Sequence, residues 1–291
     1  MRGQCDERGS GDDHAGVAHP RAGHGAAAGQ TPPCHRRLIG HGEFRGGIWQ
    51  ARGGAHWTRE WHQHQGAVAR VLLGGDGDHA SGGRNGDAFD GASISRHPRI
   101  GWDSKPTVKQ ELDAVTYHLG EMEKASTFKS NLIWTLGNHD ARFETFLAAN
   151  APQYEGVQGF TLKDFFPHWQ PCWSFWVNDD TVIKHRWKGG FGAGRANTLN
   201  AGVNMVTGHT HNMAVQPLTD YKGTRYGVQT GMLSNPDGDQ FVDYTEDGVK
   251  DWRSGFVMLT FDRGQLLMPE LIQVWDEEKG EVQFRGKIWA V

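Results

Sequence analysis

The feature that constrains the fold most is an apolar run that stops abruptly at polar residues, "LIWTLGNHDAR" at residues 132–142. Its apolar part has the length and composition of a short buried strand. Gly137 then separates this strand from an amide, an imidazole and a carboxylate, which are Asn138, His139 and Asp140. Because open α/β folds bind ligands at the carboxyl ends of their strands, the run predicts an α/β fold with a functional site at the rim of a sheet.

From residue 85 onward the chain has the pattern of an ordinary globular domain. Residues 104–126 carry apolar side chains every three to four positions, which predicts an amphipathic helix, and residues 141–150 predict a shorter helix that Pro152 stops. Strand-like runs follow at 175–185, 203–209, 224–233 and 255–262. A helix between early strands, followed by strands in close succession, predicts a layered α/β sandwich over residues 85–291.

Residues 1–84 differ in composition from the rest of the chain. They contain no Lys, Asn or Tyr, but 19 of the 41 Gly and nine of the 16 His. Apart from residues 67–73, they show no apolar period suited to a helix or a strand, so we expect this region to be poorly ordered. Two explanations remain open: a disordered Gly/His/Arg-rich extension, or a reading-frame error that has replaced the genuine start of the domain.

The whole-chain properties exclude several classes of protein. The net charge is −4 and no block of Lys or Arg stands out, so we expect no nucleic-acid surface. No apolar run reaches the roughly 18 residues that span a bilayer, and the first 30 residues lack the apolar stretch of a signal peptide. We therefore expect a cytoplasmic protein without a membrane partner. Three widely spaced cysteines argue against a disulfide framework or a thiolate zinc site.

Four polar clusters lie in order at or after strand ends, and together they offer oxygen and imidazole donors. They are "NGDAFDG" at 85–91, "GNHD" at 137–140, "VIKHRW" at 182–187 and "TGHTHN" at 207–212. Such a mixture suits manganese, iron or zinc better than calcium, magnesium or copper(I). If the last cluster is extended, alternation along the backbone directs His209 and His211 to the same side. The set predicts a site for two adjacent divalent metal ions.

The ordered set resembles the calcineurin-like metallophosphoesterases over about residues 85–275. The signature of that family is D-x-H, G-D-x-x-D, G-N-H-[DE], a lone His and G-H-x-H. The resemblance implies a four-layer α/β/β/α sandwich that holds two divalent ions, manganese, iron or zinc. It also implies a hydrolase that cleaves a phosphomonoester or phosphodiester by metal-activated water. The implied metal ligands are Asp87, which bridges the two ions, Asn138, His185 and His209 for the second ion, and His211 for the first.

The resemblance also assigns catalytic and supporting roles. It makes His139 the catalytic imidazole beside the substrate phosphate, and Asp90 the carboxylate that polarises it. Asp140 closes the motif and supports the loop. A nearby imidazole can protonate the leaving alkoxide or stabilise it electrostatically. The expected partner is a phosphoester substrate, with a nucleotide or a phosphodiester preferred, whereas the sequence does not indicate the oligomeric state.

One motif of the family has no convincing counterpart here. Asp12 and His14 have the spacing of D-x-H, but no strand precedes them, and Asp76 and His79 follow a strand with the wrong spacing. Since this gap falls in the region of unusual composition, it favours the frame error over the extension. It also keeps a second interpretation open, a catalytically silent metal-binding scaffold or a defective product. A calcium- or zinc-stabilised structural domain is disfavoured, because the imidazoles suit calcium poorly and no thiolate set exists.

Two further features have a place in the expected site. Arg186 and Arg195 are candidates for binding the substrate phosphate, although a solvated surface position is the ordinary one for Arg. The glycine-rich run at 189–197 lacks the register of a phosphate-binding loop, so we expect it to be a flap over the site.

Overall fold

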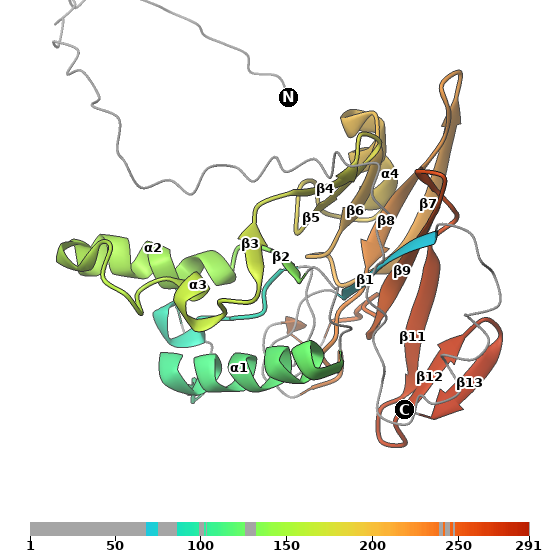
Figure 1. The fold of residues 1–291 in the computed structure, drawn as a ribbon. Coiled ribbons are helices and arrows are strands. Elements are labelled where there is room, and N and C mark those ends of the chain that lie inside the picture. The colour runs from blue at the N-terminus through green and yellow to red at the C-terminus, as the bar shows by residue number, and fades with distance from the viewer. Residues whose placement is uncertain are drawn as a thin grey trace, which may run out of the picture. The chain divides into compact units, whose positions relative to one another are not determined.

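The structure is a computed structural model that describes residues 68–74, 86–98, 102, 104–125, 132–238, 241, 245–246 and 248–290. These residues form a mixed α/β unit with three sheets and few helices (Figure 1), which confirms the predicted fold class at that level. The expectations for residues 1–84 lie outside the described residues, apart from the strand at 68–74. The predicted domain boundary at residue 85 therefore stays a prediction.

The largest sheet is antiparallel and is built around one long strand, β9. It runs in the order β1 (Val68–Gly74), β9 (Gly255–Asp262), β11 (Glu270–Asp276), β12 (Glu281–Phe284) and β13 (Lys287–Ala290), with β10 (Gln265–Leu266) also paired to β9. All seven residues of β1 pair with β9. A segment from the compositionally unusual region thus belongs to the main sheet.

A second sheet of five strands carries most of the other predicted strands. Its order is β4 (Phe175–Asn178), β5 (Thr181–Lys184), β6 (Asn204–Thr207), β8 (Gly223–Thr230) and β7 (Met213–Asp220). The neighbours β5, β6 and β8 are parallel. The single run expected at 175–185 is instead a hairpin, since its polar residues Asp179 and Asp180 form the connection between β4 and β5.

The two large sheets pack face to face. Alternate residues of β9 point to one side, and their side chains meet those of β5, β6 and β8 in a buried cluster that includes Val257, Leu259, Phe261, Ile183, Val206 and Val228. Helix α4 (Ala193–Ala201) lies on the opposite face of the second sheet, over Gly227 of β8. A Cβ on Gly227 would lie 2.0 Å from the carbonyl oxygen of Gly194, so glycine permits this close approach.

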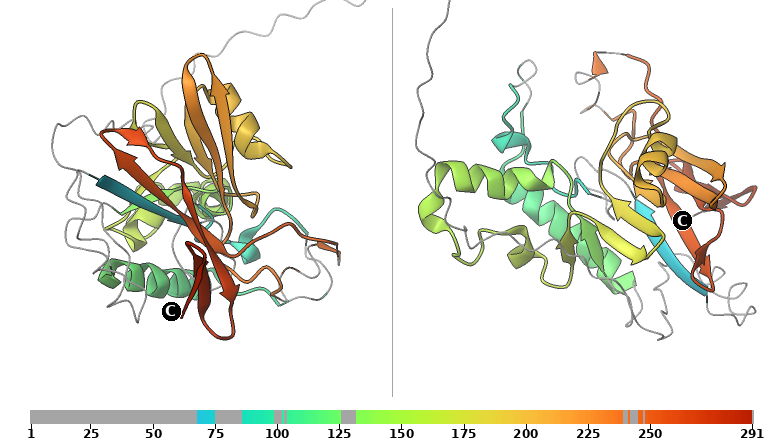
Figure 2. Two further views of the ribbon diagram at one scale, coloured as in Figure 1. Left: turned by 90° about the vertical axis from the view of Figure 1, so that its right-hand side faces the viewer. Right: turned by 90° about the horizontal axis from the view of Figure 1, so that it is seen from above.

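The remaining helices surround a small parallel sheet of β2 (Ile133–Thr135) and β3 (Gln170–Cys172), as Figures 1 and 2 show. They are α1 (Val108–Ala125), α2 (Asp140–Asn150) and α3 (Leu162–Phe165), with short 3-10 turns η1 (Ala92–Ile94) and η2 (Pro152–Tyr154). The predicted apolar stripe of α1 supplies Leu112, Val115 and Leu119 to a core that also contains Trp134 and Phe143. Both predicted helices are confirmed.

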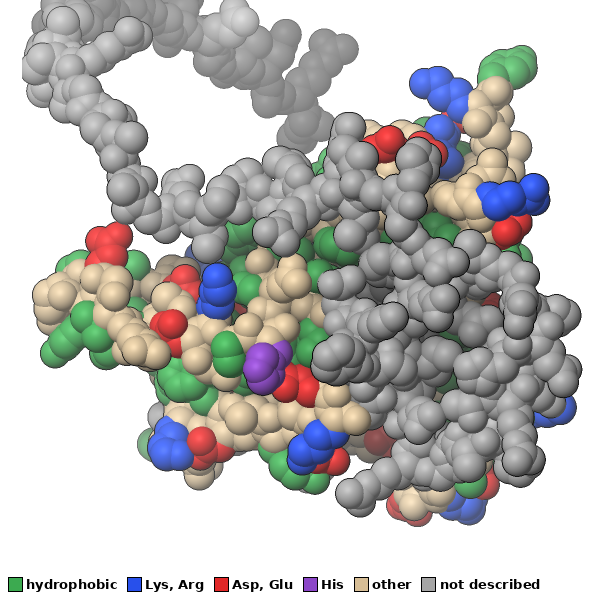
Figure 3. Space-filling model, viewed as in Figure 1, with side chains coloured by type: hydrophobic (Ala, Val, Ile, Leu, Met, Phe, Trp, Pro, Cys, Tyr) green, Lys and Arg blue, Asp and Glu red, His purple; other side chains and the backbone are tan. Residues whose placement is uncertain are grey.

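Two surface properties bear on the expected partners. Within the described part of the chain, none of the helices combines the length and apolar character needed to cross a bilayer. On the face shown in Figure 3, the basic and acidic side chains of the coloured residues are interspersed, and neither sign gathers into one patch.

Candidate metal centre

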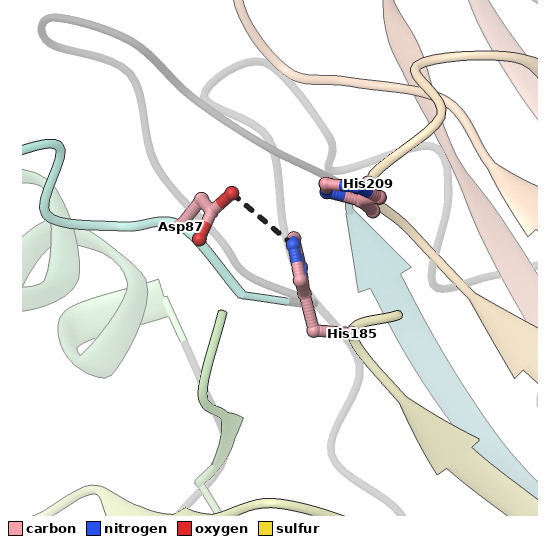
Figure 4. A group of neighbouring side chains, drawn as sticks. All are labelled: Asp87, His185 and His209. Atoms are coloured by element: carbon pink, nitrogen blue, oxygen red, sulfur yellow. Dashed lines mark ion pairs between the residues drawn. The ribbon is translucent and has the colours of Figure 1, made fainter. Parts of the chain in front are cut away.

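Three side chains from three separate segments converge at one point (Figure 4). Asp87 lies in the loop before η1, His185 directly follows β5, and His209 follows β6. One potential ligand atom from each lies within 4.8 Å of the others. Asp87 and His185 are buried, and His209 is partly exposed. A carboxylate and two imidazoles at this separation can hold one divalent ion of the manganese, iron or zinc type.

Local backbone structure explains why these residues meet. The parallel strands β5 and β6 end at the same edge of the sheet, and the N–H of Gly208 donates to the carbonyl of His185 at 2.9 Å. Asp87 and His209 both have positive φ, 51° and 68°, a conformation that is uncommon for residues with a side chain. Such outliers concentrate at functional sites, where the surrounding structure enforces them.

The carboxylate of Asp87 is the hub of the cluster. Its Oδ2 lies 3.1 Å from Nε2 of His185, and its Oδ1 accepts the backbone N–H of His139 at 2.8 Å. Burial alone would raise the pKa of Asp87, but the hydrogen bond and charge of His185 and the charge of His139 hold it below its usual range. Asp87 is therefore held as an anion, the form in which a carboxylate binds a metal ion.

Two glycines let the backbone approach this hub. A Cβ on Gly137 would lie 1.8 Å from Oδ1 of Asp87, and a Cβ on Gly86 would lie 2.1 Å from Nδ1 of His185. Real Cβ atoms do not come so close to other heavy atoms. The glycines of the G-D and G-N-H motifs are thus required by space, and at Gly86 also by a φ of 87°.

Asn138 fits the role of a neutral ligand. Its Oδ1 atom is buried and has no hydrogen-bond partner among the described residues. A buried amide oxygen without a partner is costly, and a bound cation would satisfy it. The donor set of Asp87, His185, His209 and Asn138 therefore fits a divalent ion on chemical grounds, and the first three also fit by geometry.

Asp140 ties the two acidic motifs together. Its carboxylate accepts four N–H groups, from the backbone of Asp87 (2.8 Å), Phe89 (2.9 Å) and Gly137 (2.7 Å) and from the indole of Trp134 (3.0 Å). Burial and the charge of Asp87 raise its pKa to about 6. The interpretation of Asp140 as the residue that supports the loop is confirmed.

His139 is held by a second carboxylate. Its Nδ1 lies 2.6 Å from Oδ1 of Asp90, and Arg142 donates to the carbonyl and to Oδ1 of Asp90 at 2.8 and 2.9 Å. Burial lowers the pKa of His139, but the hydrogen bond with Asp90 and the charges of Asp87 and Asp90 outweigh it and raise the pKa to about 9. The structure therefore joins His139 and Asp90 as the resemblance implies.

His211 lies outside the three-residue cluster. Its ring packs edge-on against Trp252, with 4.4 Å between ring centroids, and also contacts Phe241. The expectation of an extended segment is wrong, because His209 and His211 both have positive φ and the N–H of Thr210 donates to Gly208 in a tight turn. The two imidazoles are consequently not related by strand alternation.

The two candidate arginines have different surroundings. Arg186 directly follows His185 and is exposed. Arg195 lies in α4, where its guanidinium donates to the carbonyl of Pro217 at 3.1 Å. Of the glycine-rich run, residues 193–197 belong to α4, and only residues 189–192 form a loop.

A cavity of about 380 Å³ opens beside the cluster. His209 forms part of its wall, together with Gly189, Gly190, Phe191, Thr210, Asn212 and Asp251. The ring of Phe191 is 99 % exposed, and Asn212 donates to Asp251 at 2.9 Å. The candidate ligand His209 therefore borders a space that can hold an organic group of a ligand.

Three residues that support the loops of this centre, Arg142, Glu111 and Trp134, were not predicted from the sequence. Arg142 stands three positions after His139 in the same quoted run, a spacing that places both on one side of a helix start. Glu111 lies three positions after Val108 and four before Val115, so it is a charged residue within the apolar stripe of α1. This interruption of the stripe is the signal that could have identified it. Nothing in the sequence indicates that the indole of Trp134 donates to Asp140.

Comparisons with known proteins give distant relatives and no assigned activity. No protein-family model matches the chain, and no solved structure gives a significant match. The chain is 27 % identical over 177 residues to the Gene 54 protein of Mycobacterium phage L5, a match that covers 53 % of this chain and 65 % of that protein. It is 30 % identical over 94 residues to the Gene 54 protein of Mycobacterium phage D29, covering 31 % of this chain and 34 % of that protein. The chain thus spans less than two thirds of either relative.

Proposed function

We propose that this chain is a calcineurin-like phosphoesterase, built on a four-layer α/β/β/α sandwich, that hydrolyses a phosphomonoester or phosphodiester. One observation carries the proposal. The cluster of Asp87, His185 and His209 adjoins the pair of His139 and Asp90, because Oδ1 of Asp87 accepts the backbone N–H of His139. Metal-ligating groups and a carboxylate-held imidazole thus share one site, which is the combination that phosphoester hydrolysis needs.

The cluster geometry supports Asp87, His185 and His209 as metal ligands, donor chemistry supports Asn138, and the resemblance to the family adds His211. Asp87, Asn138, His185 and His209 would hold one divalent ion, and Asp87 with His211 would contribute to a second. Bound there, manganese, iron or zinc would supply a nucleophilic water at neutral pH and neutralise charge on the phosphate. The low pKa of Asp87 keeps this carboxylate ionised and ready to bind.

His139 is the proton donor of the proposal. Because its Nδ1 contacts Asp90, its Nε2 is the ring nitrogen that can exchange a proton with the leaving oxygen. A positioned imidazole of this kind contributes about 10²–10⁴-fold to turnover. Asp90, fixed in turn by Arg142, keeps the ring oriented.

The cavity beside His209 is the proposed place for the organic part of the substrate. Its wall offers an exposed ring at Phe191 and acceptor atoms at Asp251 and Asn212. A planar group with hydrogen-bond donors, such as a nucleobase, matches these features. Arg186, adjacent to His185, would approach the phosphate, whereas Arg195 is engaged with Pro217.

A second candidate is a metal-binding scaffold without catalytic activity. The observation that favours it is the size of the cluster, because Asp87, His185 and His209 are the only group of three or more His, Cys, Asp or Glu ligands found among the described residues. Three such ligands suffice for one ion. The scaffold and the enzyme differ in metal stoichiometry and in turnover.

The test combines metal content with hydrolysis of bis(p-nitrophenyl) phosphate and p-nitrophenyl phosphate by the purified full chain. We expect about two manganese, iron or zinc ions per chain. The His209→Ala variant should lose the metal. The control variant His168→Ala should retain it, because the imidazole of His168 pairs with Glu123 on the surface. His139→Ala should retain metal and lose most turnover. Bound metal without turnover in the unsubstituted chain supports the scaffold. Absence of specific metal binding overturns both candidates, and full activity in His139→Ala removes His139 from the mechanism.

A further inference from the structure

A buried carboxylate of α1 reaches the loop that carries Asp90. Glu111 is 6 % exposed, its Oε2 accepts the N–H of Gly91 at 2.7 Å, and its Oε1 accepts the N–H of Ala92 at 3.0 Å. Both acceptor atoms are used by backbone groups about 20 positions away in the chain. The carboxylate thus links the helix to the loop through two hydrogen bonds.

The loop has little freedom to form these contacts in another way. Gly91 has a φ of 64°, and a Cβ there would lie 2.9 Å from the ring of Phe89 and 3.1 Å from Cβ of Arg142. The N–H groups of Gly91 and Ala92 are buried with Glu111, and buried N–H groups that lose their acceptor cost free energy. Removing the carboxylate would therefore favour a shift of this loop toward other acceptors or water.

Asp90 transmits the position of the loop to the imidazole. It immediately precedes Gly91, and its Oδ1 lies 2.6 Å from Nδ1 of His139. Arg142 holds the carbonyl and carboxylate of Asp90 from the side of α2. Asp90 is consequently fixed between two helices, by Arg142 directly and by Glu111 through the next two backbone amides.

We propose that Glu111 is a positioning residue for His139, acting through Gly91, Ala92 and Asp90. The inference rests on the proposed phosphoesterase function, for which it names a residue outside the metal cluster. Small displacements of a catalytic group are costly, because catalysis depends on geometry held by surrounding residues. Glu111 lies within the apolar stripe formed by Val108, Leu112 and Val115. If its role were packing alone, an apolar side chain would serve at this position.

The experiment compares Glu111→Ala and Glu111→Gln with Asp113→Ala in the full chain. Asp113 is a matched control, since it lies on the same helix and makes an exposed pair with Lys109. We expect Glu111→Ala to lower kcat about tenfold to a hundredfold, the range found when supporting residues of metal sites are removed, with KM and metal content nearly unchanged. Glu111→Gln keeps one acceptor oxygen and should recover part of the loss, and Asp113→Ala should match the unsubstituted chain.

A second readout is independent of turnover. In the metal-free protein, the Nδ1 proton shared between His139 and Asp90 should give a low-field proton resonance, because the two atoms are 2.6 Å apart. We expect the resonance to move or broaden in Glu111→Ala, and to persist in Asp113→Ala. An unchanged resonance in Glu111→Ala overturns the proposal. A fall in kcat accompanied by a changed KM and by loss of metal binding also overturns it, because this combination indicates general unfolding. If the unsubstituted chain is inactive, the proposed function fails, and the resonance alone decides the role of Glu111.

Discussion

Oδ2 of Asp140 accepts the backbone N–H of Asp87 at 2.8 Å across 53 positions of the chain. The last residue of the G-N-H-D motif thereby helps to fix the backbone at the first aspartate of the G-D-x-x-D motif. The same Oδ2 accepts the N–H groups of Trp134 and Gly137. The candidate metal centre is therefore preorganised by a buried acceptor that lies outside the cluster of Asp87, His185 and His209.

Asp140→Asn should destabilise the protein, because an amide offers one acceptor oxygen to four donors. At least one buried N–H would lose its partner, at a cost of about 1–3 kcal/mol. Urea denaturation followed by circular dichroism measures the change. Asp164→Asn is the control, since Asp164 also accepts the N–H groups of Gly159 and Thr161, but in an exposed capping box. A loss in Asp140→Asn no larger than in this control would contradict the prediction.

Gly137→Ala should disrupt the centre, whereas Gly120→Ala should not. A Cβ at 137 would lie 1.8 Å from Oδ1 of Asp87, while nothing lies within 4 Å of a Cβ at 120 in α1. We expect loss of metal binding and of stability in the first variant. The second should gain about 0.5–1 kcal/mol, since alanine favours a helix interior over glycine. Calorimetry with manganese, together with thermal unfolding, tests the pair, and equal behaviour of the two variants would refute the geometry.

The stability of the protein should depend on the ionisation of Glu111. Burial and the charge of Asp90 raise its pKa from 4.5 to about 7, although hydrogen bonds from Ala92 and Gly91 oppose the shift. A carboxyl whose pKa is raised by folding contributes stability that is fully present below about pH 4.5 and is lost as the pH rises through about 7. The shift corresponds to at most about 3 kcal/mol.

Glu111→Gln removes this titration and checks the sign. The free energy of unfolding of the variant, minus that of the unsubstituted chain, should become more positive between about pH 5 and pH 8. Urea denaturation at several pH values measures the difference. The difference cancels the titrations that both proteins share, such as that of Asp140, whose pKa is also raised. A constant difference would show that folding leaves the pKa of Glu111 unchanged, and a falling difference would show that folding lowers it; either result contradicts the prediction.

Phe191→Ala should affect large substrates selectively. The ring borders the cavity next to His209 and is 99 % exposed, so it is available for contact with a planar group. We expect kcat/KM for an aryl or nucleoside phosphoester to fall about two- to tenfold, and that for a methyl phosphoester to remain unchanged. Leu199→Ala provides an exposed apolar control on α4. Equal effects on both substrates would place the organic group elsewhere.

Local sequence patterns were sufficient for the elements of the fold that are set by periodicity. The spacing of Leu112, Val115 and Leu119 predicted α1, and the apolar run before Gly137 predicted β2, because these patterns reflect side chains that point to one buried face. The alternation of apolar and polar side chains did not separate β4 from β5. The two residues that connect these strands lie inside a run that is otherwise strand-like.

The sequence by itself determined which residues are candidates for a site, because most of these polar side chains directly follow apolar runs of the kind that form strands. It brought forward Asp87, His185 and His209, which the structure joins, and the pair of His139 and Asp90. Only the tertiary structure decided how the pieces meet. The packing of His211 on Trp252, the bonds of Asp140 with Asp87 and Phe89, and the contact of Glu111 with Gly91 join distant segments, and no local pattern encodes a hydrogen bond across 20 or 53 positions.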